Sequence, residues 1–268
     1  PARRGSSVTF DHTRAGHTRA GQSRTDHYRA HHGRAHVSRA EFPLAEVPGT
    51  DQNVNQNHGT DGLRIDQFDA GLAGRPCRLD RAGARTRTLH VRRWRADAAR
   101  SDRWLLDGCR GPTVDLGCGP GRLVRALSER GVPALGVDSS ALAVQLCARR
   151  GAVALRRNLF EALPGEGRWH HALLADGNVG IGGDPVTLLS RVRRLLAPRG
   201  SVLVELATEP GLWCGPARVV QPGGTTGAWF PWAVVGVDAI GDVASAAGLR
   251  LCRVRNRRRA FAELRPAG

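Results

Sequence analysis

Three glycines at alternate positions and an aspartate about 20 residues later form a pattern suited to binding a nucleoside. Gly117, Gly119 and Gly121 follow a short apolar run, and Asp138 ends the next apolar run along the chain. Glycine lets a ligand approach bare backbone, and N–H groups at the start of a helix are ready to bind it. A carboxylate at this separation can accept hydrogen bonds from both ribose hydroxyls. The spacing therefore predicts a nucleoside site.

Such a site requires strands that end at the ligand and helices that begin there. The run from Thr113 to Leu116 favours a strand, and an apolar helical face follows the glycines as far as Gly131. Strand and helix patterns then alternate to the end of the chain, which predicts a doubly wound α/β fold with a mostly parallel sheet. Further strands are expected at 134–138, 152–155, 172–176, 201–206, 249–254 and 260–264. Helices are expected after Ser139 or Ser140, from Pro185 behind an Asp184 cap, and over 239–247.

The last two strands are joined only by the Arg-rich link at 255–259. A link this short predicts a hairpin, which places one antiparallel strand at the edge of the sheet.

The two glycine and aspartate segments also resemble a known family. Val114-Asp-Leu-Gly-Cys-Gly-Pro-Gly121 and Gly136-Val-Asp-Ser139 look like the first two motifs of class I S-adenosylmethionine (SAM)-dependent methyltransferases. The glycines fall as G-x-G-x-G, not as the G-x-G-x-x-G of NAD enzymes, because SAM has no pyrophosphate to cradle. The resemblance runs from about residue 92 to residue 264 and implies a Rossmann-like fold. The stretch 174–185, Leu-Ala-Asp-Gly-Asn-Val-Gly-Ile-Gly-Gly-Asp-Pro, is similar to bacterial, largely actinobacterial methyltransferases of unassigned substrate.

The resemblance implies SAM as the cofactor and assigns residues to each part of it. Gly117, Gly119 and Gly121, with Asp115 before them, would contact the methionyl end. Asp138, followed by Ser139, would bind the ribose, although Asp138 could instead cap the next helix. Asn158 and Leu159 would hold the adenine, and Asn158 stands where the family commonly has an acidic residue. An amide oxygen can still accept a hydrogen bond there, without the assistance of charge.

Asp176 and Asn178 follow the fourth expected strand and are the candidate catalytic residues. They would face the sulfonium and the acceptor, where a carboxylate or amide can orient the acceptor or accept its proton. Capping of the following turn is the alternative role. Methyl transfer from SAM is an in-line displacement, so the protein supplies mainly proximity and orientation. We expect a small-molecule acceptor in a pocket lined by Trp213, Trp229 and Trp232, and the alternative is that these side chains cover the sheet edge.

Charge and cysteine content bear on the other functions to be considered. The chain has 40 arginines, no lysine and a net charge of +16, which leaves an RNA methyltransferase as one alternative. Against it, no aromatic residues interleave with the arginines, and no Asn-Pro-Pro-Tyr type motif is present. A catalytically inactive SAM- or nucleotide-binding protein is the other alternative, since Asn158 departs from the family pattern. The six cysteines form no C-x-x-C pair, so no metal site is expected.

Composition divides the chain into three parts. Residues 1–70 read as a disordered low-complexity extension, with Arg at every fifth position from 14 to 39, often two residues after a His. Residues 71–112 form an N-terminal segment with a short helix over 94–106 that packs on the core. Residues 113–268 form the SAM-binding domain. No apolar run approaches the ~20 residues of a membrane span, and a cytoplasmic protein without a membrane partner is expected.

Overall fold

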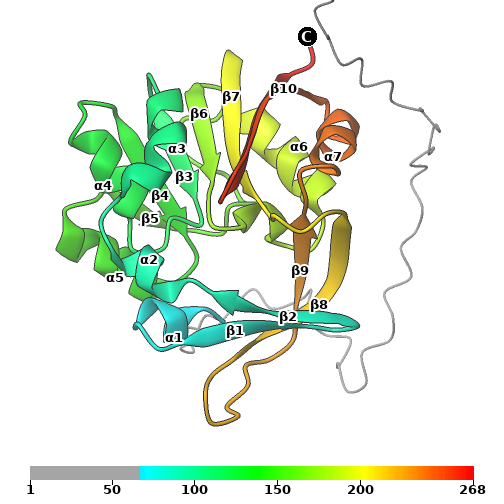
Figure 1. The fold of residues 1–268 in the computed structure, drawn as a ribbon. Coiled ribbons are helices and arrows are strands. Elements are labelled where there is room, and N and C mark those ends of the chain that lie inside the picture. Colours follow the sequence, from blue (N-terminus) through cyan, green and yellow to red (C-terminus); the bar gives the residue numbers. More distant parts are fainter. Residues whose placement is uncertain (1–66) are drawn as a thin grey trace, which may run out of the picture. The chain divides into compact units, whose positions relative to one another are not determined.

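The computed structural model describes residues 67–268, which form two β-sheets with helices packed around the larger one (Figure 1). The expected extension over residues 1–70 lies outside the described residues except for its last four. Helix α1 (Asp69–Leu72) already begins within those four residues. No helix in residues 67–268 is long and apolar enough to cross a membrane.

The larger sheet has the predicted mostly parallel arrangement. Its strands lie in the order β10-β11-β7-β6-β3-β4-β5. The five strands from β7 to β5 are parallel to one another. β11 is antiparallel to both β7 and β10, so the predicted hairpin is confirmed and its antiparallel strand lies one place in from the edge. The strands are β3 (Thr113–Leu116), β4 (Ala134–Asp138), β5 (Ala154–Arg156), β6 (Trp169–Leu174), β7 (Leu196–Leu206), β10 (Leu249–Asn256) and β11 (Ala260–Pro266).

Helices cover both faces of this sheet because successive side chains of a strand point to opposite faces. In β6, Ala172 and Leu174 pack against α6 (Pro185–Leu195) and α7 (Ile240–Ala246), whereas Leu173 packs against α3 (Arg103–Gly108) and α4 (Arg122–Ser128). Helix α5 (Ala141–Arg150) lies beside α4 through Cys147. Every one of these side chains of β6 is fully buried.

Local capping signals were read correctly from the sequence. The Ser140 side chain accepts a hydrogen bond from the N–H of Ala143 at the start of α5, at 3.1 Å. The Asp184 side chain accepts from the N–H groups of Val186 and Thr187, and Pro185 is the first residue of α6. The helix expected over 94–106 is instead broken into α2 (Val91–Arg95), a 3₁₀ turn η1 (Arg100–Asp102) and α3.

A second, antiparallel sheet was not predicted. It has the order β2-β1-β8-β9 and lies beside the carboxyl ends of the parallel strands (Figure 1). β1 and β2 come from residues before the first parallel strand, whereas β8 and β9 come from residues after the fifth. Its strands are β1 (Cys77–Arg81), β2 (Ala84–Leu89), β8 (Leu212–Val220) and β9 (Phe230–Val235). The segment 71–91 is thus largely a β-hairpin.

Candidate functional site

The glycine segment makes a sharp bend between β3 and α4. Gly117, Gly119 and Gly121 have φ angles of 71°, 51° and 75°, the left-handed region that side chains disfavour. At Gly117 a Cβ atom would also lie 2.6 Å from the Nδ2 atom of Asn178. The bend therefore depends on glycine both for its conformation and for the space beside it.

Asp138 lies directly against this bend, as predicted. β4 pairs in parallel with β3, with Val137 opposite Leu116, so both strands end at the same level. One carboxylate oxygen of Asp138 accepts a hydrogen bond from the N–H of Gly119 at 2.9 Å, and the other accepts from the N–H of Ser140 at 2.9 Å. A carboxylate at the end of this strand is suited to accept hydrogen bonds from the hydroxyls of a ribose.

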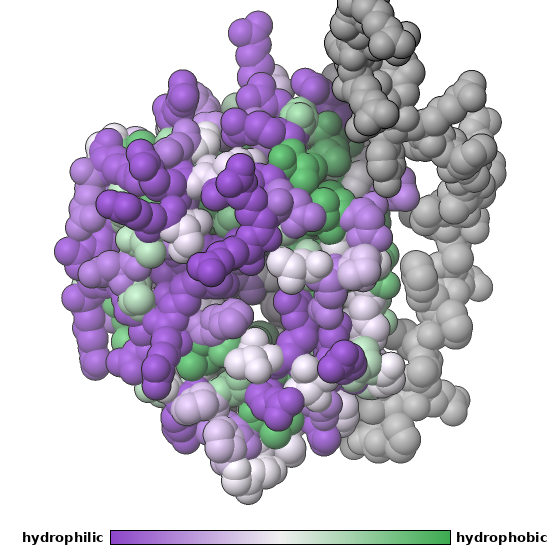
Figure 2. Space-filling view, viewed as in Figure 1, coloured by the Kyte–Doolittle hydropathy of each residue, from purple (hydrophilic) through white to green (hydrophobic). Residues whose placement is uncertain are grey.

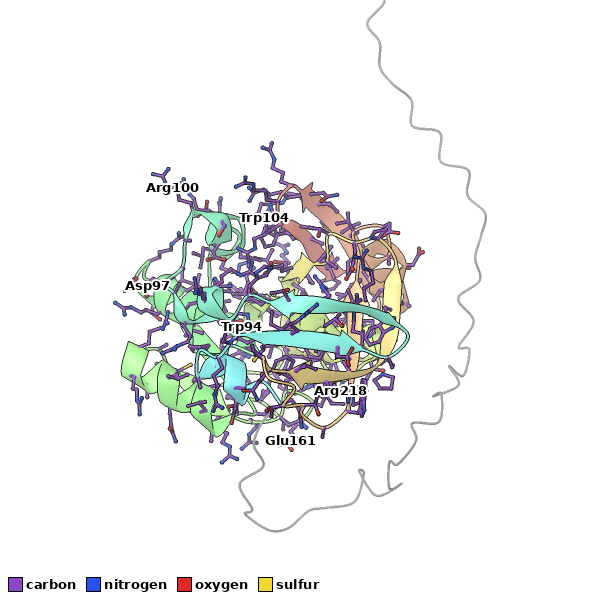
Figure 3. The ribbon with its side chains drawn as sticks, turned by 60° about the horizontal axis from the view of Figure 1, so that its bottom comes forward. Trp94, Asp97, Arg100, Trp104, Glu161 and Arg218 are labelled. Carbon is purple, nitrogen blue, oxygen red and sulfur yellow. The ribbon has the colours of Figure 1, made fainter. Side chains whose placement is uncertain are left out.

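A cavity of about 420 Å³ lies between the carboxyl ends of the parallel strands and the second sheet. This volume falls within the range of small-molecule sites. Figure 2 shows the surface hollowed near the centre of this face, and Figure 3 shows the β1–β2 hairpin crossing in front of the parallel sheet. The sequence-predicted residues that line the cavity are Gly117, Gly119, Asp138, Ser139, Asn158, Leu159, Asp176 and Asn178.

The structure does not bring Asp115 or Gly121 to the cavity. Asp115 is 2% exposed, and burial raises the pKa of its carboxyl group to about 7 despite the opposing charge of Arg122. A Cβ atom on Gly121 would lie 2.8 Å from the Sγ atom of Cys147, so this glycine serves the packing of α4 on α5. Direct contact of either residue with a ligand in the cavity is therefore not supported.

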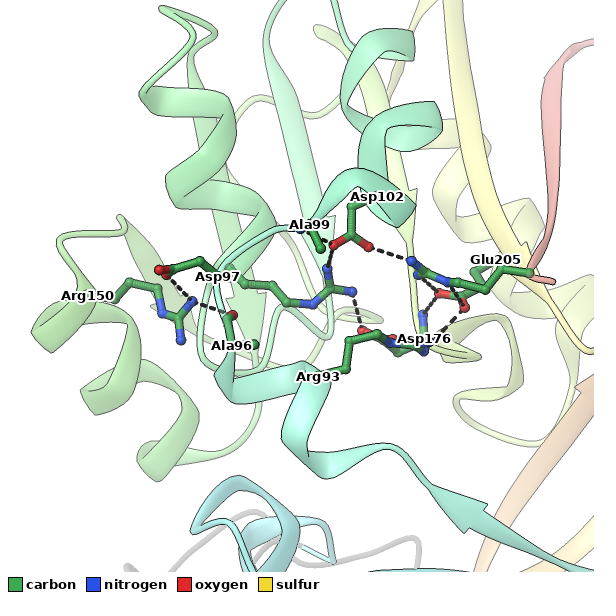
Figure 4. A network of polar contacts seen from close by, with 10 residues as sticks. Arg93, Ala96, Asp97, Ala99, Asp102, Arg150, Asp176 and Glu205 are labelled. Carbon is green, nitrogen blue, oxygen red and sulfur yellow. Dashed lines mark hydrogen bonds and ion pairs between the residues drawn. The ribbon is translucent and has the colours of Figure 1, made fainter.

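Asp176 belongs to a network of three arginines and three carboxylates at one side of the cavity (Figure 4). Its Oδ1 atom accepts from the Nε atom of Arg93 at 2.9 Å, and its Oδ2 atom accepts from Arg122 at 2.7 Å. Burial raises the pKa of Asp176, but Arg122 and Arg93 outweigh burial and hold it below its usual value. The carboxylate stays ionised and is a poor proton acceptor at neutral pH, since a general base works best with a pKa near the operating pH.

The other members of the network are bound equally closely. Arg259 donates to both carboxylate oxygens of Glu205, at 2.8 and 2.6 Å, and to Asp102 at 2.7 Å. Arg122 contacts the other oxygen of Asp102 at 2.6 Å. The Glu205 carboxylate also accepts a hydrogen bond from the backbone N–H of Asp176, at 2.7 Å. The three positive and three negative charges therefore balance within the network.

Residues 113–200 match the sequence profile of a family described as methyltransferase domain. No curated protein matches the chain.

Solved structures share the fold of this chain. A SAM-dependent methyltransferase from Bacteroides fragilis, in complex with S-adenosyl-L-homocysteine, is 20% identical with a TM-score of 0.64, over 76% of this chain and 95% of that one. The 1,6-didemethyltoxoflavin-N1-methyltransferase of Burkholderia thailandensis is 20% identical with a TM-score of 0.50, over 67% and 84%. The glycopeptide N-methyltransferase MtfA is 14% identical with a TM-score of 0.51, over 65% and 88%. These likenesses confirm the expected Rossmann-like fold.

Asn178 holds the glycine bend in place. Its Nδ2 atom donates to the carbonyl oxygens of Leu116 and Gly117, at 2.9 and 2.8 Å. Both amide hydrogens are thereby used by the backbone. Asn178 and Asp176, the two candidate catalytic residues, are thus both placed on the cavity wall but act first through other protein groups.

Asn158 and Leu159 lie on the cavity wall after β5. The Oδ1 atom of Asn158 accepts a hydrogen bond from the N–H of Phe160 at 3.1 Å. An amide oxygen has two lone pairs, so one acceptor position remains for a ligand. Leu159 is buried in the main core, which makes its contribution to the cavity an apolar one.

An aromatic cluster on the cavity wall was only partly predicted. The ring centroid of Phe68 lies 5.5 Å from that of Phe230 and 5.4 Å from that of Trp232, and all three line the cavity. Of the three tryptophans expected there, only Trp232 is on the wall. Trp213 lies under the Arg81 guanidinium, and Trp229 under that of Arg218.

Sequence reasoning also missed the arginines of the network. Arg122 directly follows the glycine segment, and this position could have drawn attention to it. Arg93 and Arg259 carry no such signal, because arginine is frequent throughout the chain.

Proposed function

We propose that this protein is a SAM-dependent methyltransferase that acts on a small-molecule acceptor. The hydrogen bond between Asp138 and the N–H of Gly119 carries this proposal, because it sets a ribose-binding carboxylate against bare backbone at the wall of a cavity of ligand size. The match of residues 113–200 to a methyltransferase domain supports it. The SAM- and S-adenosyl-L-homocysteine-bound methyltransferases of the same fold support the choice of cofactor.

The residues of the cavity fit each part of SAM. Asp138 would accept from the ribose hydroxyls, and Asn158 and Leu159 would receive the adenine. Gly117 and Gly119 would leave space for the methionyl end. Asp115 and Gly121 would act only by shaping the bend.

SAM supplies a methyl carbon that is already activated by the sulfonium. The protein has to orient the acceptor in line with that carbon and keep water out, and it needs no covalent nucleophile. The second sheet and the aromatic cluster of Phe68, Phe230 and Trp232 would exclude water above the cavity. Asp176 would act as a positioning residue that fixes Arg93 and Arg122.

A small-molecule acceptor agrees with the setting of the cavity beneath a second sheet. The Burkholderia thailandensis neighbour, named as a 1,6-didemethyltoxoflavin-N1-methyltransferase, has a small-molecule substrate. RNA stays a second candidate because of the net charge of +16. A protein that binds SAM without catalysis is the third.

Calorimetry with SAM and S-adenosyl-L-homocysteine tests the cofactor site. We expect both to bind the wild-type protein, and Asp138→Ala to weaken binding at least about 10-fold by removing charge-assisted hydrogen bonds. Asp97→Ala is the matched control, since this aspartate is 86% exposed and does not line the cavity. Absence of binding to the wild type would contradict the proposal.

Transfer of a labelled methyl group then separates the three candidates. Incubation with labelled SAM and either a small-molecule extract or total RNA should label only the small-molecule fraction. Label in RNA would favour the second candidate, and cofactor binding without any transfer would favour the third.

A further inference from the structure

The cavity carries an excess of positive charge. Six arginines but only three carboxylates line it. A SAM molecule would add a sulfonium to this surplus, so an electrically neutral or positive acceptor would leave the cavity unbalanced. The arginines are Arg87, Arg93, Arg122, Arg157, Arg258 and Arg259, and the carboxylates are Asp138, Asp176 and Glu205.

Three of these arginines are balanced by carboxylates, and a fourth lies on the expected adenine side of the cavity. Arg93, Arg122 and Arg259 belong to the balanced network with Asp102, Asp176 and Glu205. Arg157 lies beside Asn158 on the expected adenine side, and its side chain donates to the carbonyl oxygen of Ala162 at 3.2 Å. Arg87 and Arg258 are the two arginines that remain for the acceptor side of the cavity.

Arg87, on β2, shares a single carboxylate with another arginine. The Oε1 atom of Glu209 lies 3.4 Å from Nη1 of Arg87 and 3.3 Å from Nη1 of Arg81. That oxygen is buried, and neither contact is a well-formed hydrogen bond. The Arg87 side chain is 38% exposed, and burial lowers its pKa. One carboxylate thus faces two guanidinium groups, which leaves one positive charge on this wall.

Arg258 lies in the turn between β10 and β11. Its side chain is exposed and lines the cavity, and no carboxylate of residues 67–268 lies within ion-pair distance of it. The turn reaches the carboxyl end of β7, because Ala260 pairs with Leu206. Glu209, the neighbour of Arg87, follows the same end of β7. Both unbalanced arginines therefore lie around the end of this strand.

The end of β7 lies away from the nucleoside position. In the sheet order β7-β6-β3-β4, β7 is two strands from the glycine bend that follows β3. At about 4.8 Å per strand, this places it roughly 10 Å from the bend. The distance suits an acceptor that lies beyond the methionyl end. The rings of Phe230 and Trp232 also line the cavity.

We propose that the acceptor carries an anionic group, a carboxylate or a phosphate, which Arg87 and Arg258 bind over the end of β7. Its apolar body contacts Phe230 and Trp232. Guanidinium groups suit this role because they bind carboxylate and phosphate oxygens through paired hydrogen bonds. The inference rests on the proposed methyltransferase function and names the chemical class of its acceptor.

Three probes of one shape test this class: 2-naphthoate, 2-naphthyl phosphate and the neutral 2-naphthamide. Their affinities are measured by calorimetry on the full chain saturated with S-adenosyl-L-homocysteine. We expect one or both anions to bind at least about 10-fold more tightly than the amide, and the preference to shrink as salt is added. The naphthoate and phosphate arms tell the two anionic groups apart.

Arginine variants locate the binding site of the anion. Arg87→Gln and Arg258→Gln should each weaken binding of the preferred anion about 10-fold and leave naphthamide binding unchanged. Arg85→Gln on the same strand and Arg257→Gln in the same turn are matched controls, since neither side chain lines the cavity. The controls should bind all three probes as the wild type does.

Several results would overturn the inference. These are equal affinity for anions and amide, no binding of either anion, or equal losses in the variants and their controls. In each case S-adenosyl-L-homocysteine binding would persist, which separates failure of this inference from failure of the cofactor site.

Discussion

Asp115→Asn should stabilise the protein at neutral and alkaline pH. Asp115 is 2% exposed in the middle of β3, and burial raises the pKa of its carboxyl group from 3.8 to about 7. The Arg122 guanidinium lowers this pKa, while Asp176 and Asp138 raise it further. Asparagine has nearly the same shape and carries no charge, so it removes the cost of ionising a buried group.

The size of the effect follows from the pKa shift. A rise of about three units, at about 1.4 kcal/mol each, corresponds to roughly 4 kcal/mol lost when Asp115 ionises in the folded state. A buried amide must itself find hydrogen bonds, which costs about 1–2 kcal/mol where they are imperfect. We therefore expect Asp115→Asn to raise the free energy of unfolding by about 2–3 kcal/mol at pH 8.

The pH dependence has a definite sign. Below pH 3.8 both folded and unfolded chains hold the Asp115 proton, so the aspartate costs nothing there. Between pH 3.8 and about 7 only the folded chain holds it, so wild-type stability falls as the pH rises. The advantage of the variant should grow through this window and level off above it. His171, whose pKa burial lowers, acts in the opposite direction but cancels in the difference between the two proteins.

Urea unfolding of the wild type and Asp115→Asn from pH 4 to pH 8 measures this difference. Asp97→Asn, at an exposed position, is the control and should shift stability little at any pH. Because Asp115 does not line the cavity, the affinity of Asp115→Asn for S-adenosyl-L-homocysteine should match that of the wild type. A variant less stable than the wild type at pH 8, or a difference that does not change with pH, would refute the reasoning.

Three further predictions concern the network, the bend and a helix cap. Asp102→Ala leaves the buried Arg122 without that partner and should cost about 3–5 kcal/mol in urea unfolding. Burial raises the pKa of Asp102, but its arginine partners outweigh burial and lower it, so the stability it provides should be lost as the pH falls below about 4. Gly117→Ala should destabilise the protein by about 1–2 kcal/mol more than Gly131→Ala, because both glycines have left-handed φ but only Gly117 is crowded. Equal losses in those two variants would show that crowding is unimportant. Ser140→Ala should lower thermal stability by about 1 kcal/mol through loss of the cap, and an unchanged melting temperature would contradict this.

The parallel sheet was predictable because its signals are local. A strand that runs into glycines, a serine cap at Ser140 and an Asp184–Pro185 helix start each depend on neighbouring residues. The second sheet lacks such signals. β2 alternates arginine and threonine, β1 has only five residues, and β1 pairs with β8, with Arg78 opposite Val220. Strands so far apart in the chain give no local sequence signal that they pair.

The site was predicted best where a residue follows a strand end. Asp138 could be placed beside the glycine bend because neighbouring parallel strands end at one level. Asp115 does not line the cavity, and the sequence could not show this: β3 is buried on both faces, so no alternation of polar and apolar residues tells which side chain faces the cavity. For a related reason, only one of the three expected tryptophans lines the cavity. Trp213 and Trp232 lie on paired strands, and the sequence did not reveal that pairing or which rings it turns toward the cavity.

The second sheet joins segments from both sides of the parallel strands, and this has a consequence for how such proteins diversify. Residues 77–89 cannot complete their sheet without β8, and β8 cannot cover its apolar face without β1. Neither half is an exchangeable module by itself. On the proposed function, transferring the acceptor preference of one relative to another would require exchanging the β1–β2 and β8–β9 segments together, while the parallel sheet that would bind the methyl donor stays unchanged.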